Sequence, residues 1–310
     1  MVQSSKIVDC VIAEYPLVQM SAVHGLKELA DTANRLAPTS MPKLNVTTCL
    51  LSSRTPRHKS DFGVVVLPPC LSHTPPSLQN FKLALDWINR CHLKGSLICS
   101  VCSGSFILAE TGLLDGRSAT THWVYASSFQ DKFPQIELQF DRLIDHHGDV
   151  MTAGGLMAWT DLGLRLIEHF QGTQTMLEVS RLFLLEPKLR QQKQYALFVP
   201  KHNHDDEKIL TVQRLIEEQF TRRWSITDMA QKAGLTERTF LRRFKRSTEL
   251  NPTQYLQQIR ITAARTKLET STHSIEQVAQ LVGYTDTPAF ARIFKRIVGL
   301  PPGVYRKRFI

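Results

Sequence analysis

Residues 96–105 read SLICSVCSGS, and this stretch indicates the fold of the first two thirds of the chain. Its first part, residues 96–101, is a short apolar run typical of a buried strand. A helix follows with no loop residues to spare, and Gly104 relieves the crowding at the junction. Such a junction is the geometry of a nucleophile elbow, which holds one side chain, here Cys102, in a strained turn at a helix N-terminus.

Short apolar runs alternate with amphipathic stretches on both sides of this junction. The patterns predict strands at 6–12, 44–51, 61–67 and 96–101, helices at 19–36, 77–91, 103–111 and 156–169, and a hairpin at 142–153. Alternation of this kind predicts an α/β fold, here a flavodoxin-like parallel sheet sandwiched by helices.

The carboxyl ends of the predicted strands supply the candidate ligand-binding residues, because open α/β sheets bind ligands at that edge. These candidates are Glu14, Cys70, Cys102, Ser103 and His122. A helix N-terminus favours a thiolate, so Cys102 with His122 as its base would form a Cys/His dyad if the domain is an enzyme. The alternative is that both side chains only hold the elbow and pack the core.

All six cysteines lie in the first third of the chain. Cys99 and Cys102 have the spacing of a redox or zinc pair, but Cys99 falls inside the predicted buried strand. We therefore interpret most of the cysteines as small apolar core residues.

Several motifs in residues 1–185 resemble the class I glutamine amidotransferase-like domains of the PfpI superfamily, in the branch fused to AraC-type DNA-binding domains. The motifs are VCSGSFILA at 101–109, GLLDGR at 112–117, ATTHW at 119–123 and TAGG at 152–155. In active PfpI-type hydrolases the residue after the cysteine is typically His, whereas this chain has Ser103, and the superfamily's acid aligns with Ser21. The resemblance therefore implies a catalytically inactive domain that senses a small molecule, with Cys102 and His122 as vestiges.

Charge is distributed unevenly along the chain. Residues 201–310 hold 20 Lys and Arg against 11 Asp and Glu, while the other 200 residues hold 18 against 17. A concentrated positive end indicates a polyanionic partner, and nucleic acid is the leading candidate. No apolar run approaches the ~20 residues of a membrane helix, so we expect a cytoplasmic protein without a membrane partner.

At ~150 residues per domain, 310 residues predict two domains. The boundary falls in polar, poorly periodic sequence, which gives a sensor domain at 1–190, a linker at 191–207 and a DNA-binding domain at 208–310. The linker contains the metal-ligating residue types His202, His204, Asp205 and Asp206. Clustered polar side chains in a connector are usually solvated, so we expect no metal site, and we expect no cofactor.

The last hundred residues contain an internal repeat. SITDMAQKAG at 225–234 aligns with SIEQVAQLVG at 274–283. Each copy opens with a Ser N-cap and a capping box, buries one apolar face and ends at a Gly that permits a tight turn. This is the first helix and turn of a helix-turn-helix, present twice.

The second helix of each copy carries a phenylalanine face and a basic face. FLRRFKR at 240–246 aligns with FARIFKR at 290–296. A bundle packed through the phenylalanines presents its arginines outward, as a reader of the DNA major groove requires.

These repeats resemble the tandem helix-turn-helix of the AraC/XylS family over residues 209–309, with the signature completed by GLPPGVYR at 299–306. The resemblance implies an all-α domain in which a long helix, about 253–269, bridges two units that enter successive major grooves ~34 Å apart. It implies base contacts from Arg238, Arg242, Thr287 and Arg292, whereas Arg243, Lys245, Lys295 and Arg296 are expected to contact phosphates or to be solvated.

The sequence therefore predicts a DNA-binding transcription regulator, an activator by resemblance. Its expected partners are promoter DNA, RNA polymerase, a second copy bound through the amino-terminal domain, and a small effector such as an amino acid or a quaternary amine. The rival hypothesis is a cysteine-dependent hydrolase or glyoxalase-like enzyme with a DNA-binding tail. A third is a regulator that binds no ligand.

Overall fold

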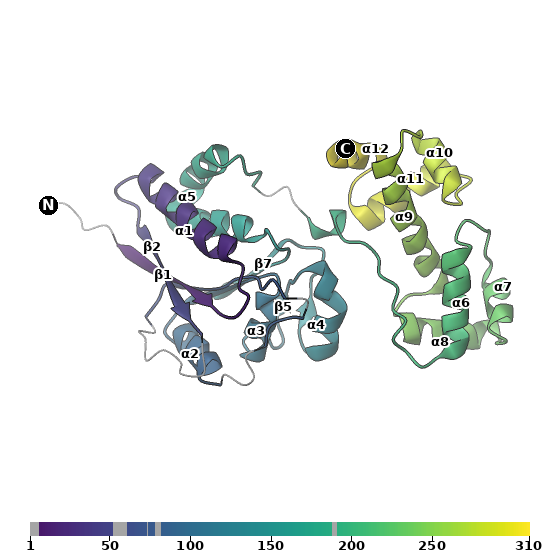
Figure 1. Ribbon diagram of the computed structural model, residues 1–310, viewed down its shortest axis with the longest axis horizontal. Coiled ribbons are helices and arrows are strands. Elements are labelled where there is room, and N and C mark those ends of the chain that lie inside the picture. Colours follow the sequence, from purple (N-terminus) through teal and green to yellow (C-terminus); the bar gives the residue numbers. More distant parts are fainter. Residues whose placement is uncertain (1–5, 52–60, 73, 78–81, 188–190) are drawn as a thin grey trace. The chain divides into compact units, whose positions relative to one another are not determined.

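The computed structural model describes residues 6–51, 61–72, 74–77, 82–187 and 191–310. The chain forms two compact units, Met1–Gln192 and Lys193–Ile310. Figure 1 shows an α/β unit at the amino-terminal end of the chain and an all-helical unit at the carboxyl-terminal end.

The amino-terminal unit is built on a six-stranded sheet. In spatial order its strands are β2 (Lys43–Leu50), β1 (Ile7–Glu14), β3 (Val64–Leu67), β4 (Leu97–Val101), β8 (Val150–Ala153) and β7 (Ile144–His147). All neighbours pair in parallel except β7 and β8, which form the predicted hairpin. The flavodoxin-like α/β prediction is confirmed.

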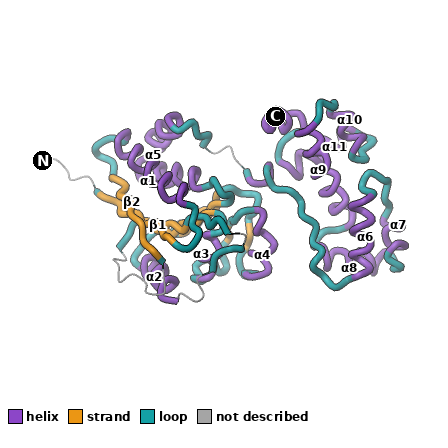
Figure 2. The backbone as a smooth tube through the Cα atoms, in the orientation of Figure 1, coloured by secondary structure: helices purple, strands orange, loops and turns teal. Residues whose placement is uncertain are grey.

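Helices cover both faces of this sheet, as Figure 2 shows. Helices α1 (Met20–Leu36) and α5 (Trp159–Leu182) pack against each other and against one face. Helices α2 (Lys82–Leu93) and α3 (Gly104–Glu110) share a core with the other face. Successive strand residues point to opposite faces, so Val66 joins the first core and Val65 the second.

Some elements differ from the predictions. A small second sheet pairs β5 (Ser118–Ala119) with β6 (Glu137–Leu138), and between them lie the 3-10 turn Trp123–Tyr125 and α4 (Ala126–Lys132). Two-residue strands are too short to show an apolar period, which is why the sequence did not indicate them. Helix α5 continues to Leu182 through a kink at Gly172, beyond the predicted end at 169. The start of the helix predicted at 77–91 falls partly outside the described residues.

The carboxyl-terminal unit consists of seven helices in its described chain. They are α6 (Glu207–Glu218), α7 (Ile226–Lys232), α8 (Glu237–Thr248), α9 (Pro252–Thr270), α10 (Ile275–Leu281), α11 (Thr287–Val298) and α12 (Pro302–Phe309). They enclose two separate cores: Tyr255 and Leu256 of α9 belong to the first, and Ile261, Ala264 and Leu268 to the second. Helix α9 is therefore the bridging helix that the resemblance implied.

The residues predicted to form a linker, 191–207, are divided between the two units. Gln192 is buried in the amino-terminal unit, whereas Gln194 is buried in the carboxyl-terminal unit. Within that second unit Phe198 packs edge-on against Tyr255, and Tyr195 against Phe309. No helix in the described part of the chain is long and apolar enough to span a membrane.

Candidate nucleic-acid interface and elbow site

The first helix-turn-helix comprises α7 and α8. The Ser225 hydroxyl accepts the N–H of Asp228, and the Asp228 carboxylate accepts the N–H of Ser225, so both halves of a capping box are present. The turn passes through Gly234 with a φ of 59°. Helix α8 then begins at a second cap, where Thr236 accepts the N–H of Thr239.

The second copy, α10 and α11, repeats this construction. Ser274 and Gln277 form the capping box, and the turn residue Gly283 has a φ of 85°. A Cβ at Gly283 would lie 2.6 Å from the main-chain oxygen of Thr221, so the close approach also requires glycine here. In both copies the phenylalanines predicted to face inward, Phe240, Phe244, Phe290 and Phe294, are fully buried.

The opposite faces of α8 and α11 are basic. Their exposed cations are Arg238, Arg242, Lys245, Arg246, Arg292, Lys295 and Arg296. Of these, only Arg296 has a hydrogen-bond partner among the described residues, the side-chain oxygen of Gln257 at 2.7 Å. The other six carry charges that no described carboxylate neutralises, so their donors are available to an external anion. Thr287, at the first position of α11, is half-buried.

Arg243 differs from its neighbour Arg242. Its Nε and Nη2 donate to the two carboxylate oxygens of Asp206 at 2.8 and 2.6 Å. Asp206 is the N-cap of α6 and also accepts the N–H of Ile209. The expected phosphate contact from Arg243 therefore does not fit this geometry, because its guanidinium joins α8 to the start of α6.

The polar residues of the predicted linker have protein partners too. His202 lies 2.9 Å from a carboxylate oxygen of Glu217, and His204 lies 2.7 Å from the side-chain oxygen of Gln213. With Asp206 bound to Arg243, these side chains stabilise the carboxyl-terminal unit around α6.

The strand-to-helix junction in the amino-terminal unit is an elbow, as predicted. Cys102 adopts a φ of 56°, a left-handed conformation that is unfavourable for a residue with a side chain. Helix α3 starts two residues later at Gly104, where a Cβ would lie 2.3 Å from the main-chain oxygen of Leu67. The junction therefore admits only glycine at that position.

Burial dominates the electrostatics of the elbow cysteine. Cys102 is 2% exposed, and this burial raises the pKa of its thiol to about 12. The N–H and hydroxyl of Ser103 and the N–H of Gly155 face the sulfur and oppose the shift without overcoming it. The thiolate expected for an active dyad is therefore not favoured at neutral pH.

The structure brings together three of the five candidate ligand-binding residues. The Ser103 hydroxyl accepts the N–H of Cys70 at 2.9 Å, and Cys70 lies near enough to Cys102 to add to the rise that burial causes in the pKa of the Cys102 thiol. His122 forms no hydrogen bond with Cys102 within the described chain; its Nδ1 accepts the N–H of Val124 at 3.1 Å, and burial lowers its pKa. Glu14 lies at the end of β1 beside Leu50 of β2, and the pKa of the nearby Cys49 is raised first by burial and then by the Glu14 charge.

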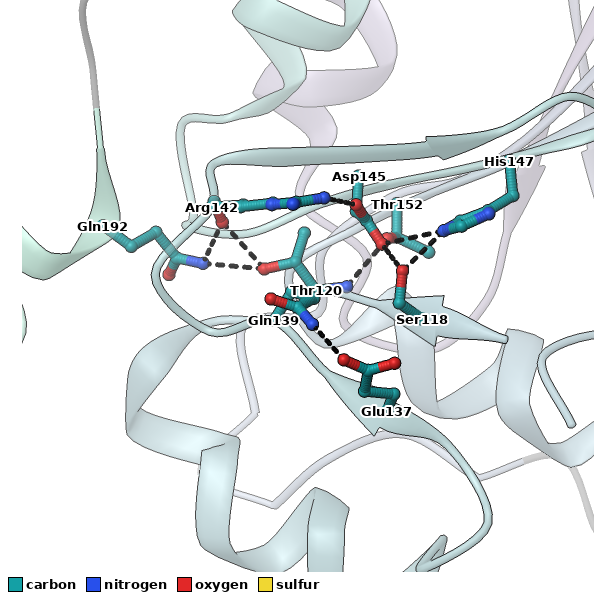
Figure 3. Close-up of polar contacts among 9 residues, drawn as sticks. All are labelled: Ser118, Thr120, Glu137, Gln139, Arg142, Asp145, His147, Thr152 and Gln192. Atoms are coloured by element: carbon teal, nitrogen blue, oxygen red, sulfur yellow. Dashed lines mark hydrogen bonds and ion pairs between the residues drawn. The ribbon is translucent and has the colours of Figure 1, made fainter. Parts of the chain in front are cut away.

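Three residues that sequence reasoning missed lie around the elbow. The Tyr15 hydroxyl donates to the main-chain oxygen of Pro68, and its pKa is raised first by burial and then by Cys70 and Cys102. Burial and then Cys102 raise the pKa of Tyr125. Gln192, from the end of the unit, inserts its amide beside Thr120 and Arg142, as Figure 3 shows. No local sequence pattern marks these contacts, since each joins residues more than 20 positions apart.

Comparison with known families matches both units. The DJ-1/PfpI family matches residues 51–169, and a helix-turn-helix domain family matches residues 229–308. The amino-terminal unit is thus similar to the DJ-1/PfpI family, and the carboxyl-terminal unit is similar to helix-turn-helix domains.

Among curated proteins the chain is similar to AraC-type regulators. The HTH-type transcriptional regulator GbdR of Pseudomonas aeruginosa is 27% identical over 67% of this chain and 57% of its own length. The HTH-type transcriptional regulator GlxA of Rhizobium meliloti is 28% identical over 77% of this chain and 74% of its own length. The matched region thus spans little more than half of GbdR.

A solved structure supports the fold of the amino-terminal unit. The crystal structure of a candidate transcriptional regulator from Vibrio parahaemolyticus aligns with 58% of this chain and all of that chain, with 22% identity and a TM-score of 0.51. The chain is thus similar to HTH-type transcriptional regulators, with a DJ-1/PfpI match in its amino-terminal unit and a helix-turn-helix match in its carboxyl-terminal unit.

Proposed function

We propose that the protein is a sequence-specific DNA-binding regulator of transcription. The observation that carries this proposal is the duplicated, capped helix-turn-helix, whose second helices expose Arg238 and Arg242 in α8 and Arg292 in α11 without a described partner. In this assignment Arg238, Arg242, Thr287 and Arg292 contact base edges, and Lys245, Lys295 and Arg296 contact phosphates. The protein acts in the cytoplasm on promoter DNA and contacts RNA polymerase as an activator.

The amino-terminal unit, in this proposal, binds a small metabolite at the elbow and mediates dimerisation. Cys70, Cys102 and Ser103 lie together there, with Tyr15 and Tyr125 beside them. An amino acid or a quaternary amine is the effector class that family resemblance favours. The effector must bind one arrangement of the chain better than another, because equal affinities shift no equilibrium.

Two measurements on the full-length protein test the proposal. Selection of binding sites from a random DNA pool should enrich one sequence, and a panel of amino acids and quaternary amines should contain a compound that raises the unfolding temperature. Enrichment of no sequence would refute sequence-specific binding. Enrichment without any stabilising compound would favour the regulator that binds no ligand.

A cysteine-dependent hydrolase is the second candidate, and the left-handed φ of Cys102 is the observation that favours it. The buried thiol and the missing link to His122 count against it. Alkylation by iodoacetamide across pH separates the two functions. A thiolate that forms below neutrality, with turnover lost in Cys102→Ala, would establish the enzyme.

A further inference from the structure

Gln192 is held in the amino-terminal unit by its side chain. The residue is 3% exposed, and its amide nitrogen donates to the hydroxyl of Thr120 at 3.0 Å and to the main-chain oxygens of Thr121 and Arg142 at 2.8 and 2.9 Å. Its amide oxygen accepts the N–H of Trp123 at 3.1 Å. Figure 3 shows the Gln192 amide pointing at Thr120 and Arg142.

These partners form a slot shaped for a carboxamide. One wall is Gly154, where a Cβ would lie 1.9 Å from the Gln192 nitrogen. The Arg142 wall is fixed in turn, because the Arg142 side chain donates to the buried Asp145 at 2.7 Å (Figure 3). The slot offers three oxygens and one N–H; the two N–H donors of a primary amide serve the three oxygens, one donor being shared, and its oxygen accepts the N–H. We call Thr120, Thr121, Trp123, Arg142 and Gly154 the carboxamide slot.

The carboxamide slot adjoins the elbow on two sides. The Thr121 hydroxyl donates to the main-chain oxygen of Cys102 at 2.9 Å, and the Ser105 hydroxyl donates to the same oxygen at 2.8 Å. On the other side Gly154 precedes Gly155, whose N–H faces the Cys102 sulfur. A ligand that displaces the elbow would therefore displace walls of the slot as well.

The chain just beyond Gln192 is anchored in the carboxyl-terminal unit. Arg265 of α9 is 4% exposed and donates to the main-chain oxygens of Gln194, at 2.6 Å, and Ala196. Gln194 itself is 4% exposed. Only Lys193 separates the residue held in the first unit from the residue held in the second.

We propose that the carboxamide slot is a binding site for a primary amide, occupied by Gln192 of this chain, and that it clamps the connection between the two units. Emptying the slot frees the chain at Lys193. An elbow ligand that opens or tightens the slot would thereby change how freely the carboxyl-terminal unit moves. The clamp stands on the contacts above, whereas its effect on DNA binding rests on the proposed function.

Limited trypsin digestion of the full-length protein tests the clamp, because proteolysis follows the population of opened chain. Gln192→Ala should speed cleavage after Lys193, which yields fragments 1–193 and 194–310, by about 10-fold or more. Gln192→Glu should do the same, because a carboxylate has no donors for the three oxygens. Gln191→Ala is the matched control, since Gln191 is exposed. Cleavage after Lys193 at the unmodified rate in Gln192→Ala would overturn the proposal, and so would acceleration at every tryptic site alike.

A second measurement tests the coupling. The affinity of Gln192→Ala for the selected DNA site, without metabolite, should differ from that of Gln191→Ala by about 5-fold or more. Equal affinities would overturn the coupling. If the unmodified protein also selects no DNA site, the proposed function is refuted. The trypsin digestion still tests whether Gln192 restrains the chain at Lys193, because it does not depend on DNA binding.

Discussion

Arg243 and Asp206 form a two-pronged ion pair, although 37 positions separate them in the sequence. The Asp206 side chain is 8% exposed, and the pair fixes α8 against the first turn of α6. The adjacent Arg242 is exposed and has no partner in the described chain. Two neighbouring arginines of one helix therefore have separable roles, and this difference supplies two predictions.

Arg242→Ala should weaken binding to the selected DNA site by ~1–3 kcal/mol, with relaxed preference at one base position. Arg292→Ala, in the second copy, should cause the same loss of affinity and of base preference. The unfolding temperature should not change, because neither side chain has an internal partner to lose. Fluorescence anisotropy on cognate and scrambled duplexes measures this, and equal weakening on both would show that these arginines are phosphate contacts.

Arg243→Ala should instead lower the unfolding temperature. Hydrogen bonds from Arg243 lower the pKa of Asp206, so the pair stabilises the folded state where that carboxylate is charged. The difference in free energy of unfolding between the unmodified and the Arg243→Ala protein should have its largest value at neutral pH. This difference should decrease once the pH falls below ~3.9, the ordinary pKa of Asp in an unfolded chain, and should vanish below the lowered pKa of Asp206 in the folded protein. Thermal melts across pH measure it, and a difference that persists in acid would contradict the role given to the pair.

The Cys102 thiol should resist alkylation at neutral pH. With a pKa of about 12, its thiolate fraction at pH 7 is on the order of 10⁻⁵. Iodoacetamide labelling followed by peptide mass spectrometry should show slow modification at pH 7, with a rate that keeps rising above pH 9 and reaches no plateau there. Fast labelling with a midpoint below pH 7 would contradict the burial argument and support the hydrolase.

Gly104→Ala should destabilise the amino-terminal unit by more than ~3 kcal/mol, because the new Cβ meets main-chain oxygens of Leu67 and Pro68 that cannot move aside. Gly303→Ala is a suitable control, since a Cβ there has open space and alanine favours the helix α12. Chemical denaturation of the two variants compares them. Similar midpoints would show that the elbow backbone relaxes more easily than its geometry indicates.

Local sequence predicted a large part of this structure. The predicted strand at 96–101 is β4, and the predicted capping boxes at Ser225 and Ser274 are both present. The alternation of apolar runs and amphipathic stretches also matches the order of strands and helices. These features depend on residues within a few positions of one another, so periodicity and capping chemistry report them directly. The short strands β5 and β6 and the extension of α5 beyond 169 depend on packing partners, and local pattern did not reveal them.

The candidate sites divide in the same way. The sequence by itself determined the elbow at Cys102, the inward phenylalanines and the basic faces of α8 and α11, because helix period and glycine position decide which side chains share a face. Only the tertiary structure decided that Arg243 pairs with Asp206, that Glu14 lies beside Leu50 of β2, and that Gln192 fills a slot beside the elbow. Each of these depends on which distant polar groups become buried together, and burial obliges such groups to find partners wherever the folded chain places them.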